Sequence, residues 1–384
     1  MKKYILFFVS STCFITANLT AQTITKVAGI HTSKSGSSGD GGPALSAALT
    51  HPDGIAFDTL GNLYFSDVNV IRKIDHKGII TTVGGNGIEG YSGDNKLATL
   101  TNLKAPRKIV FDNRNNMYFS DQDGTCVRKI SSETGIITTI IGDGIEHDNE
   151  KGYMSDNNND DGVNRELSKQ TSVYIENLSI DKFDNLYITE HSIVRKLDLK
   201  KNLIIRYAGT GEYRKNENVE GDGCLASKVS IGFPQKVGFD KYGNGYFTER
   251  NRGKGFLRKI NNQGVISTIA GCLNCTDDDV IQTNRLALAA KSTILFPLDF
   301  EVDNSGNKYI LSQNMGFNKP SSRVLFKIDN NGMIKQLIDF KKVDYLEGFQ
   351  INCLTSDRNG NIYIGLSPIT YGEEGGFIYK ISLK

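Results

Sequence analysis

Short apolar runs separated by turn-forming residues recur along the whole chain. In the first unit they fall at 54–57, 63–66, 71–74 and 79–83, and we call them strands a, b, c and d. Gly, Asn and Asp stand between the runs, and these residues favour tight turns. Each unit is therefore predicted to be a sheet of four short antiparallel strands.

One signature marks the turn between strands a and b in every unit. An Asp precedes a Tyr by six positions, and Gly and Asn residues that tolerate positive φ lie between them. The six pairs are Asp58/Tyr64, Asp112/Tyr118, Asp181/Tyr187, Asp240/Tyr246, Asp303/Tyr309 and Asp357/Tyr363. Six copies of a four-stranded unit at long spacing predict an all-β fold, namely a six-bladed β-propeller of four-stranded antiparallel blades.

The last unit contains strands a to c only, because the sequence stops at Lys384, soon after its strand c. Residues 23–29 resemble 266–271, which form a strand d with a closing Ala-Gly pair. We expect the N-terminal strand to complete the last blade and close the ring, since this protects an otherwise open sheet edge. The alternative is a leader that packs against nothing.

The charge balance bears on the partners of this chain. Lys and Arg number 45 and Asp and Glu number 43, so the formal net charge is +2. The excess is accounted for by Lys2 and Lys3, and the remainder of the chain is neutral overall. A neutral chain carries no electrostatic footprint for nucleic acid, so no nucleic-acid partner is expected.

Residues 1–21 have the composition of a secretory signal peptide. Two lysines come first, 4–14 are mostly apolar but too short to span a bilayer, and small residues lead to Ala21. We predict cleavage near Ala21, a single propeller over 22–384, and a protein located in the envelope or outside the cell. Lipidation at Cys13 is the alternative. No later run is long enough for a membrane helix, so no transmembrane segment is expected.

The loops between units and the strands that follow them carry a recognisable motif. Its elements are Ser-Gly-Asp-Gly-Gly-Pro-Ala at 38–44, Gly-Ile-Ala-Phe-Asp at 54–58, Gly-Asn-Leu-Tyr at 61–64 and Ile-Arg-Lys-Ile at 71–74, with partial Gly-Asp loops at 92–94 and 221–223. Together they resemble the NHL repeat over 23–384. The resemblance implies a six-bladed propeller but leaves the function open, because such propellers include interaction modules, receptor ectodomains, RNA-binding proteins and a few enzymes.

Strand a of each unit is expected to line a central channel. Its large apolar residues, such as Phe57, should pack against the neighbouring blade, and its small or polar residues should face the axis. Asp299 and Glu301 place charge on the axis, where it must be paired or solvated. Lys108 and Lys236 are the expected partners. Either the channel is simply neutralised and wet, or it binds a small anionic or zwitterionic ligand.

A polar ring is predicted at the channel mouth, on the face formed by the long loops between blades, and it consists of Asp53, Arg107, Glu176, Gln235 and Asn352. The acids Asp67, Asp121, Glu190 and Glu249 lie at the ends of strand b. They either form turns by binding backbone amides or, together with the oxygens of the ring, suit a hard cation such as Ca²⁺. Lactonase-like propellers imply Glu176, Asn177 and Asp299 as ligands, but nearby basic residues oppose this, so no cofactor is assigned. The ligand-binding candidates are Lys108, Asn177, Lys236, Asp299, Glu301, Asp53, Arg107, Glu176, Gln235, Asn352 and His191.

Other candidate chemistry is sparse. Cys272 and Cys275 suit a local disulfide in an exported protein, whereas a lone Cys-x-x-Cys pair is weak support for zinc. His51 and His191 approach the mouth, fewer than the three-His zinc site of NHL-like amidating lyases requires. The sequence contains neither a Gly-x-Ser-x-Gly elbow nor a His-Glu-x-x-His motif.

These observations favour an exported binding or interaction scaffold. It would present its loop-rich face and channel mouth to a protein, peptide or glycan partner, and no catalytic residue is assigned. The alternative is a hydrolase or lyase of the lactonase-like or strictosidine-synthase-like kind, with calcium as its candidate cofactor. Its site would lie around Glu176, Asn177, Asp299 and Glu301.

Overall fold

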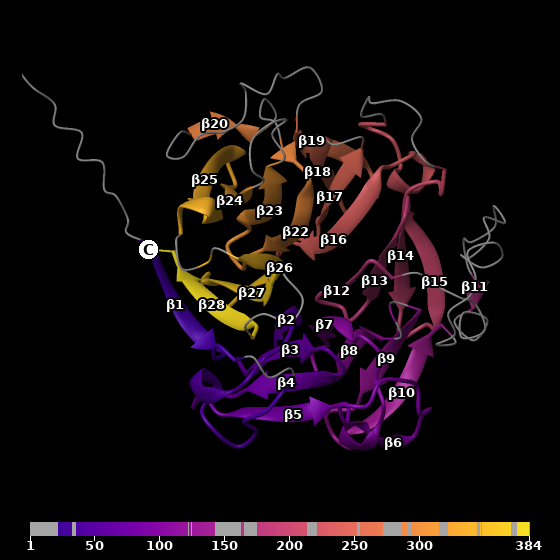
Figure 1. Cartoon of the computed structure of the whole chain (residues 1–384). Helices are drawn as coiled ribbons and strands as arrows, with labels where there is room; N and C mark the ends of the chain where they lie inside the picture. Colours follow the sequence, from indigo (N-terminus) through magenta and orange to yellow (C-terminus); the bar gives the residue numbers. More distant parts are fainter. Residues whose placement is uncertain are drawn as a thin grey trace, which may run out of the picture.

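The computed structural model describes residues 22–32, 36–121, 123, 125–142, 163–164, 175–212, 221–251, 254–271, 286–289, 294–314, 322–343, 346, 348–369 and 375–383. Its strands form six antiparallel sheets arranged around a central axis (Figure 1). The predicted six-bladed β-propeller is therefore confirmed. The predicted signal peptide lies outside the described residues and stays a prediction.

The first five blades each contain four consecutive strands, from the axis outward. They are β2 Pro52–Phe57, β3 Leu63–Asp67, β4 Val70–Ile74 and β5 Ile80–Gly84; β7 Arg107–Phe111, β8 Met117–Asp121, β9 Cys126–Ile130 and β10 Ile136–Ile141; β12 Asn177–Ile180, β13 Leu186–Glu190, β14 Ile193–Asp198 and β15 Leu203–Ala208; β16 Phe233–Phe239, β17 Gly245–Asn251, β18 Lys254–Ile260 and β19 Ile266–Ala270; and β22 Pro297–Val302, β23 Lys308–Asn314, β24 Ser322–Ile328 and β25 Met333–Asp339. Short 3-10 helices cover Ala44–Ser46, Ala98–Leu100, Ala226–Lys228 and Phe340–Lys342.

The sixth blade is shared between the two ends of the described chain. It consists of β26 Phe349–Ser356, β27 Ile362–Pro368 and β28 Phe377–Ser382, completed by β1 Thr23–Ala28. The strands β1 and β28 are antiparallel, with Ile24 opposite Ile381. The indigo β1 lies beside the yellow β28 in Figure 1, so the predicted closure of the ring is confirmed.

Short additional strands, which the sequence pattern did not predict, extend four of the sheets. Three pair with outer strands: β6 Lys96–Leu97 with β10, β11 Val163–Asn164 with β15, and β20 Leu286–Leu288 with β25. The fourth, β21 Ile294–Leu295, pairs with β18. The first three cover backbone groups that a four-stranded blade would leave unpaired at its outer edge.

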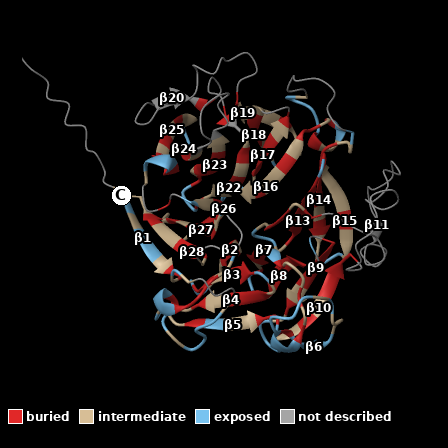
Figure 2. Cartoon of the chain, viewed as in Figure 1, coloured by how far each residue is buried: buried red, intermediate tan, exposed pale blue. Residues whose placement is uncertain are grey.

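The core lies between the blades, where buried residues concentrate on the strands (Figure 2). As predicted, the large apolar residues of each inner strand pack against the neighbouring blade. Phe57 of β2 contacts Tyr363 of β27, with ring centroids 4.9 Å apart, and Phe111 of β7 lies 4.6 Å from Tyr64 of β3. Apolar burial between neighbouring sheets therefore holds the ring together.

The Asp-Tyr signature forms the same structure in all six blades, which we call the turn lock. In blade 1, Oδ2 of Asp58 accepts hydrogen bonds from the Asn62 side chain and the Tyr64 hydroxyl, and Oδ1 accepts from backbone amides. A lysine of strand c, Lys73 in blade 1, covers the tyrosine ring. One carboxylate thus fixes the turn and both strands that leave it.

Two faces of the ring follow from this topology. The loop face carries the connections between blades and the turns between strands b and c, and the hairpin face carries the turn locks. Within the described residues, no helix is long and apolar enough to cross a membrane.

Candidate functional site

The inner strands are less regular than strict alternation predicts. Register shifts interrupt the pairing of β2, β7, β16, β22 and β26 with their neighbours. In β7 the shift falls at Lys108, whose φ is 32°, and the corresponding Gly54 of β2 has φ 47°. Such bulges turn side chains away from the direction that alternation assigns to them.

Asp53 and Lys108 link the first two blades near the channel mouth. The Lys108 Nζ lies 3.2 Å from Asp53 Oδ1, which also accepts the Gly54 amide at 2.7 Å. Burial opposes the charge of Asp53, but Lys108 and this amide outweigh burial and lower the pKa of Asp53. The sequence led us to expect Lys108 to pair with Asp299 or Glu301. Its close ion pair is with Asp53; burial opposes the charge of Lys108, but attraction by Asp53 and Asp299 outweighs burial and raises the pKa of Lys108.

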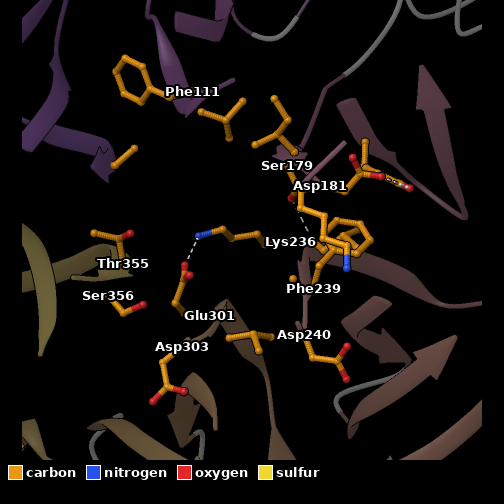
Figure 3. Close-up of a pocket in the computed structure, with 18 of the residues that line it drawn as sticks. Phe111, Ser179, Asp181, Lys236, Phe239, Asp240, Glu301, Asp303, Thr355 and Ser356 are labelled. Carbon is orange, nitrogen blue, oxygen red and sulfur yellow. Dashed lines mark hydrogen bonds and ion pairs between the residues drawn. The ribbon is translucent and has the colours of Figure 1, made fainter. Parts of the chain in front are cut away.

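Lys236 and Glu301 form the predicted ion pair deeper in the channel. Lys236 Nζ of β16 lies 2.6 Å from Glu301 Oε2 of β22, and both side chains are largely buried (Figure 3). Burial disfavours the ammonium, but Glu301 and the nearby Asp299 outweigh burial and raise the pKa of Lys236. The pair joins blades 4 and 5.

Asp299 is buried and bound to the backbone. Its two carboxylate oxygens accept the amides of Phe300 and Leu354, each at 2.8 Å, and the second of these belongs to blade 6. Asn177 repeats the local contact in blade 3, where its side-chain oxygen accepts the Leu178 amide at 3.0 Å. Both residues are therefore oriented by backbone donors.

Two further contacts connect neighbouring blades at the channel. The Val237 amide of blade 4 donates to Ser179 Oγ of blade 3 at 3.2 Å. Asn352 of blade 6 donates to Ser367 at 2.8 Å and to the Pro52 carbonyl of blade 1 at 3.4 Å. The polar residues predicted for a ligand site thus also connect inner strands of adjacent blades.

The remaining candidates lie at the mouth on the loop face. Arg107 and His191 are exposed, and the His191 ring lies 6.2 Å from Phe233. Burial raises the pKa of Glu176 to about 7, because repulsion from Glu190 adds to burial and attraction by Arg250 is weaker. Among the described residues, the buried Nε2 of Gln235 has no hydrogen-bond partner.

A cavity of about 440 Å³ opens at the opposite end of the channel, on the hairpin face (Figure 3). Each inner strand contributes at least two residues to its lining, and these include the equivalent residues Ala56, Val110, Ser179, Gly238, Glu301 and Thr355. These are the positions predicted to face the axis. The sequence pattern pointed to the loop face and did not predict this cavity, because the shape of the cavity depends on how far apart the six inner strands lie.

The Gly-Asp loops carry an ion pair that the sequence pattern did not predict. Asp40 reaches the fully buried Arg72 of β4 at 2.6 Å and accepts the Thr82 amide of β5 at 2.9 Å. Asp94 with Arg128, and Asp222 with Arg258, repeat the arrangement in blades 2 and 4. We call these three pairs the loop clips.

A signal for the loop clips was present in the sequence. The clipped arginines occupy one register position of strand c, and blades 1, 2 and 4 are those with Gly-Asp loops. In blade 3 the same position holds Arg195, which lies 3.3 Å from Glu190. The position holds Phe326 in blade 5 and Tyr379 in blade 6, whose loops lack the motif. Each of the blades 1, 2 and 4, which have the loop aspartate, therefore also has the arginine.

The acids at the ends of strand b bind loop amides, as their alternative interpretation predicted. Asp67 accepts the amides of Thr50 and His51, Asp121 accepts that of Lys104, and Glu249 accepts that of Gly232. Within the described part of the chain, no three His, Cys, Asp or Glu side chains are grouped so that they could hold a metal ion.

The cysteines contribute little to the described site. Cys126 and Cys353 are buried, and burial raises the pKa of the Cys353 thiol to about 12. Cys224 is exposed. The predicted Cys272–Cys275 disulfide lies outside the described residues and stays a prediction.

Six copies of one repeat, closed into a ring of six four-stranded blades, support an NHL-type propeller. The sequence model of the Teneurin NHL domain matches residues 27–90 and 86–210. Chicken teneurin-1 is 24% identical over 395 aligned residues, which cover 88% of this chain and 14% of that protein. Mouse teneurin-3 is 25% identical over 358 residues, covering 78% of this chain and 12% of that protein. This chain therefore corresponds to a small part of these relatives.

Solved structures agree on the fold. A protein of unknown function from Bacteroides thetaiotaomicron superposes with a TM-score of 0.54 at 18% identity, covering 95% of this chain and 76% of that one. A gluconolactonase from Xanthomonas campestris superposes with a TM-score of 0.50 at 9% identity, covering 88% and 89%. At these identities the likeness concerns the fold alone.

Proposed function

We propose that this chain is an exported interaction module of bacterial type. It binds a protein, peptide or glycan partner in the envelope or outside the cell through its loop face and channel mouth. The observation that carries this proposal is the set of loop clips, because they hold the Gly-Asp loops in place before a partner arrives. A preordered loop loses less conformational entropy on binding.

The loop between β5 and β7 offers apolar groups to such a partner. Ile88 is 61% exposed, and Leu100, in the 3-10 helix Ala98–Leu100, is 66% exposed. In the same loop, Tyr91 is stacked on the Arg128 guanidinium at 4.7 Å. Exposed apolar side chains on an ordered loop suit contact with another protein, and the teneurin relatives are consistent with that use.

Affinity capture with matched surface variants tests the proposal. The full propeller is immobilised and exposed to envelope and culture-fluid fractions, and a retained partner is purified for calorimetry. The loop-face variant combines Ile88→Ser and Leu100→Ser. The control combines Leu60→Ser and Tyr242→Ser, whose side chains are equally exposed on the hairpin face.

We expect the loop-face variant to lose about tenfold or more in affinity, since burial of two large apolar side chains is removed. The hairpin-face control should bind as the parent does. Equal affinities for parent and loop-face variant, or failure of repeated captures to retain any partner, would overturn the proposal.

A hydrolase or lyase is the second candidate function, and one observation favours it. Glu176 at the mouth has a pKa raised to about 7 by burial, which suits a group that exchanges protons near neutral pH. Its site would also include Asn177, Asp299 and Glu301, with calcium as the candidate ion. Metal analysis and lactone hydrolysis by parent and Glu176→Gln test it. Stoichiometric calcium and activity lost in the variant would support the enzyme, whereas a metal-free, inactive parent would exclude it.

A further inference from the structure

The cavity on the hairpin face is distinct from the surface assigned to the proposed function. It lies at the other end of the channel, between the turn locks of several blades, and Asp181, Asp240 and Asp303 of three locks belong to its wall. Its volume of about 440 Å³ falls within the range of small-molecule sites.

The charges at its centre already neutralise each other. Lys236 and Glu301 are in contact at 2.6 Å, with side chains only 19% and 18% exposed (Figure 3). A charged ligand would have to separate this pair or bring an unpaired charge into a site shielded from water, and both are costly. A neutral ligand with hydroxyl groups can hydrogen-bond to both side chains while the pair stays intact.

Hydroxyl and apolar groups surround this pair. Ser179 uses its oxygen to accept the Val237 amide, which leaves its hydroxyl proton available to donate into the cavity. Thr355 and Ser356 line the cavity from β26 (Figure 3). Apolar side chains of blades 1 to 5 contribute much of the remaining wall, with Val110 and Val302 among them.

An aromatic ring stands at the rim. Phe183 lines the cavity although it is 60% exposed, and its ring is flanked by Lys182 at 5.2 Å. The Lys182 ammonium also donates to the Lys241 carbonyl at 2.9 Å, which steadies this part of the rim. An exposed ring beside hydroxyl and charged groups provides an apolar face for a ring-shaped ligand that is polar at its edge.

We propose that this cavity binds the terminal residue of a neutral saccharide. The hydroxyls of the sugar bond to Lys236, Glu301 and Thr355, and Phe183 packs on the apolar face of its ring. The site is independent of the loop face, so a glycan held here leaves the partner surface of the proposed function unoccupied.

Saturation-transfer NMR and calorimetry on the full chain test this site. The probes are glucose, galactose, mannose and N-acetylglucosamine as neutral sugars, gluconate as a sugar anion, and glycine and a dipeptide as zwitterions. The variants are Phe183→Ala and Thr355→Val, the second of which removes a hydroxyl without changing the shape. Leu60→Ala is the matched control, because Leu60 has the same place in the turn of blade 1, is 78% exposed, and does not line the cavity.

We expect at least one neutral sugar to bind with millimolar or better affinity, and each variant to weaken binding about fivefold. Leu60→Ala should bind as the parent does, and partner capture by the loop face should be unchanged in all three variants. The proposal is overturned if no neutral sugar binds, if gluconate or a zwitterion binds more tightly than every neutral sugar, or if both cavity variants bind sugar like the parent.

Discussion

The Arg72 guanidinium and the Asp40 carboxylate meet at 2.6 Å, although the two residues are 32 positions apart in the chain. The arginine is fully buried and the aspartate side chain is half exposed. Asp40 also accepts the Thr82 amide of β5, so this one carboxylate joins the loop to two strands of blade 1. Loss of the carboxylate would leave a buried cation short of a partner.

Asp40→Asn should therefore destabilise the propeller while preserving its fold. We expect a loss of about 1–3 kcal/mol in the free energy of unfolding, because Arg72 keeps its bond to the Ser38 carbonyl and the attraction of Asp67. Urea denaturation measures the loss. Glu89→Gln, an exposed carboxylate in the next loop, is the control and should change stability by less than about 0.5 kcal/mol. Equal stability of both variants would mean that the loop clip contributes nothing.

Tight contact between inner strands predicts the effect of a glycine substitution. A Cβ added to Gly54 would lie 2.5 Å from the backbone nitrogen of Lys108, and Gly54 has a φ of 47°. Gly54→Ala should cost about 2–4 kcal/mol, since backbone atoms of blade 2 cannot yield as a flexible side chain would. Gly61→Ala separates strain from crowding, because Gly61 has φ 86° but open space around it. Calorimetric melting should show a loss of about 1 kcal/mol in the free energy of unfolding for Gly61→Ala. Comparable losses in both variants would show that crowding at Gly54 adds nothing.

The turn locks predict a loss of stability at alkaline pH. Burial, with the charge of the lock aspartate, raises the pKa of the tyrosines at 64, 187, 246, 309 and 363, in Tyr363 to about 12. A pKa raised by folding means that the folded chain holds protons which the unfolded chain releases above pH ~10. The stabilisation is therefore complete below pH ~10 and is lost as the pH rises through 12.

Tyrosinate absorbance and circular dichroism during an alkaline titration measure this effect. We expect the lock tyrosines to ionise late and together with unfolding, whereas in concentrated urea all tyrosines should ionise near pH ~10. Ionisation of every tyrosine near that value in the folded protein would show that the hydroxyl–carboxylate bonds do not form.

These locks also show how far the sequence determines the fold. The Asp-Tyr repeat predicted the number of blades and the hairpin turns because the hydrogen bonds of each lock are local, and those of Asp58 reach no further than Tyr64. The loop clips were missed because Asp40 and Arg72 are far apart in the chain. The pairing could be inferred only by comparing blades. Arg72 is present where the loop motif is present, and Phe326 takes its position in a blade whose loop lacks the motif.

The sequence predicted which residues line the channel but not how all of their side chains pair. Alternation along strand a placed Glu301 and Ser179 at the axis, and both line the cavity. It could not predict the bulge at Lys108, where β2 approaches closely. The close ion pair of Lys108 is therefore with Asp53, and Asp299 only adds to the attraction. The position of the cavity on the hairpin face depends on the relative tilt of six sheets, which no local pattern encodes.

Glu176 predicts a pH-dependent effect at the channel mouth. In the folded chain the pKa of Glu176 is about 7, which lies above its ordinary value. The carboxylate therefore destabilises the folded state once the pH exceeds the pKa that Glu176 has in the unfolded chain. The stabilisation of the folded state by the protonated carboxyl group is present at acid pH and is lost as the pH rises through 7. Glu176→Gln should therefore raise stability by about 1 kcal/mol above neutrality and leave it unchanged well below pH ~4. Urea denaturation of parent and variant at both pH values measures this, and a gain at acid pH alone would contradict it.

The strand β1 closes the ring by pairing with β28 and by burying Ala28 completely. Removing residues 1–28 should expose Ile381 and Phe377 and open the edge of blade 6, so that the contacts between blades 6 and 1 weaken as well. We expect the melting temperature to fall by about 5 °C or more. The matched control removes residues 1–21 and keeps all of β1. Its melting temperature should equal that of the parent, and an equally small effect of both truncations would show that the ring is stable without its N-terminal strand.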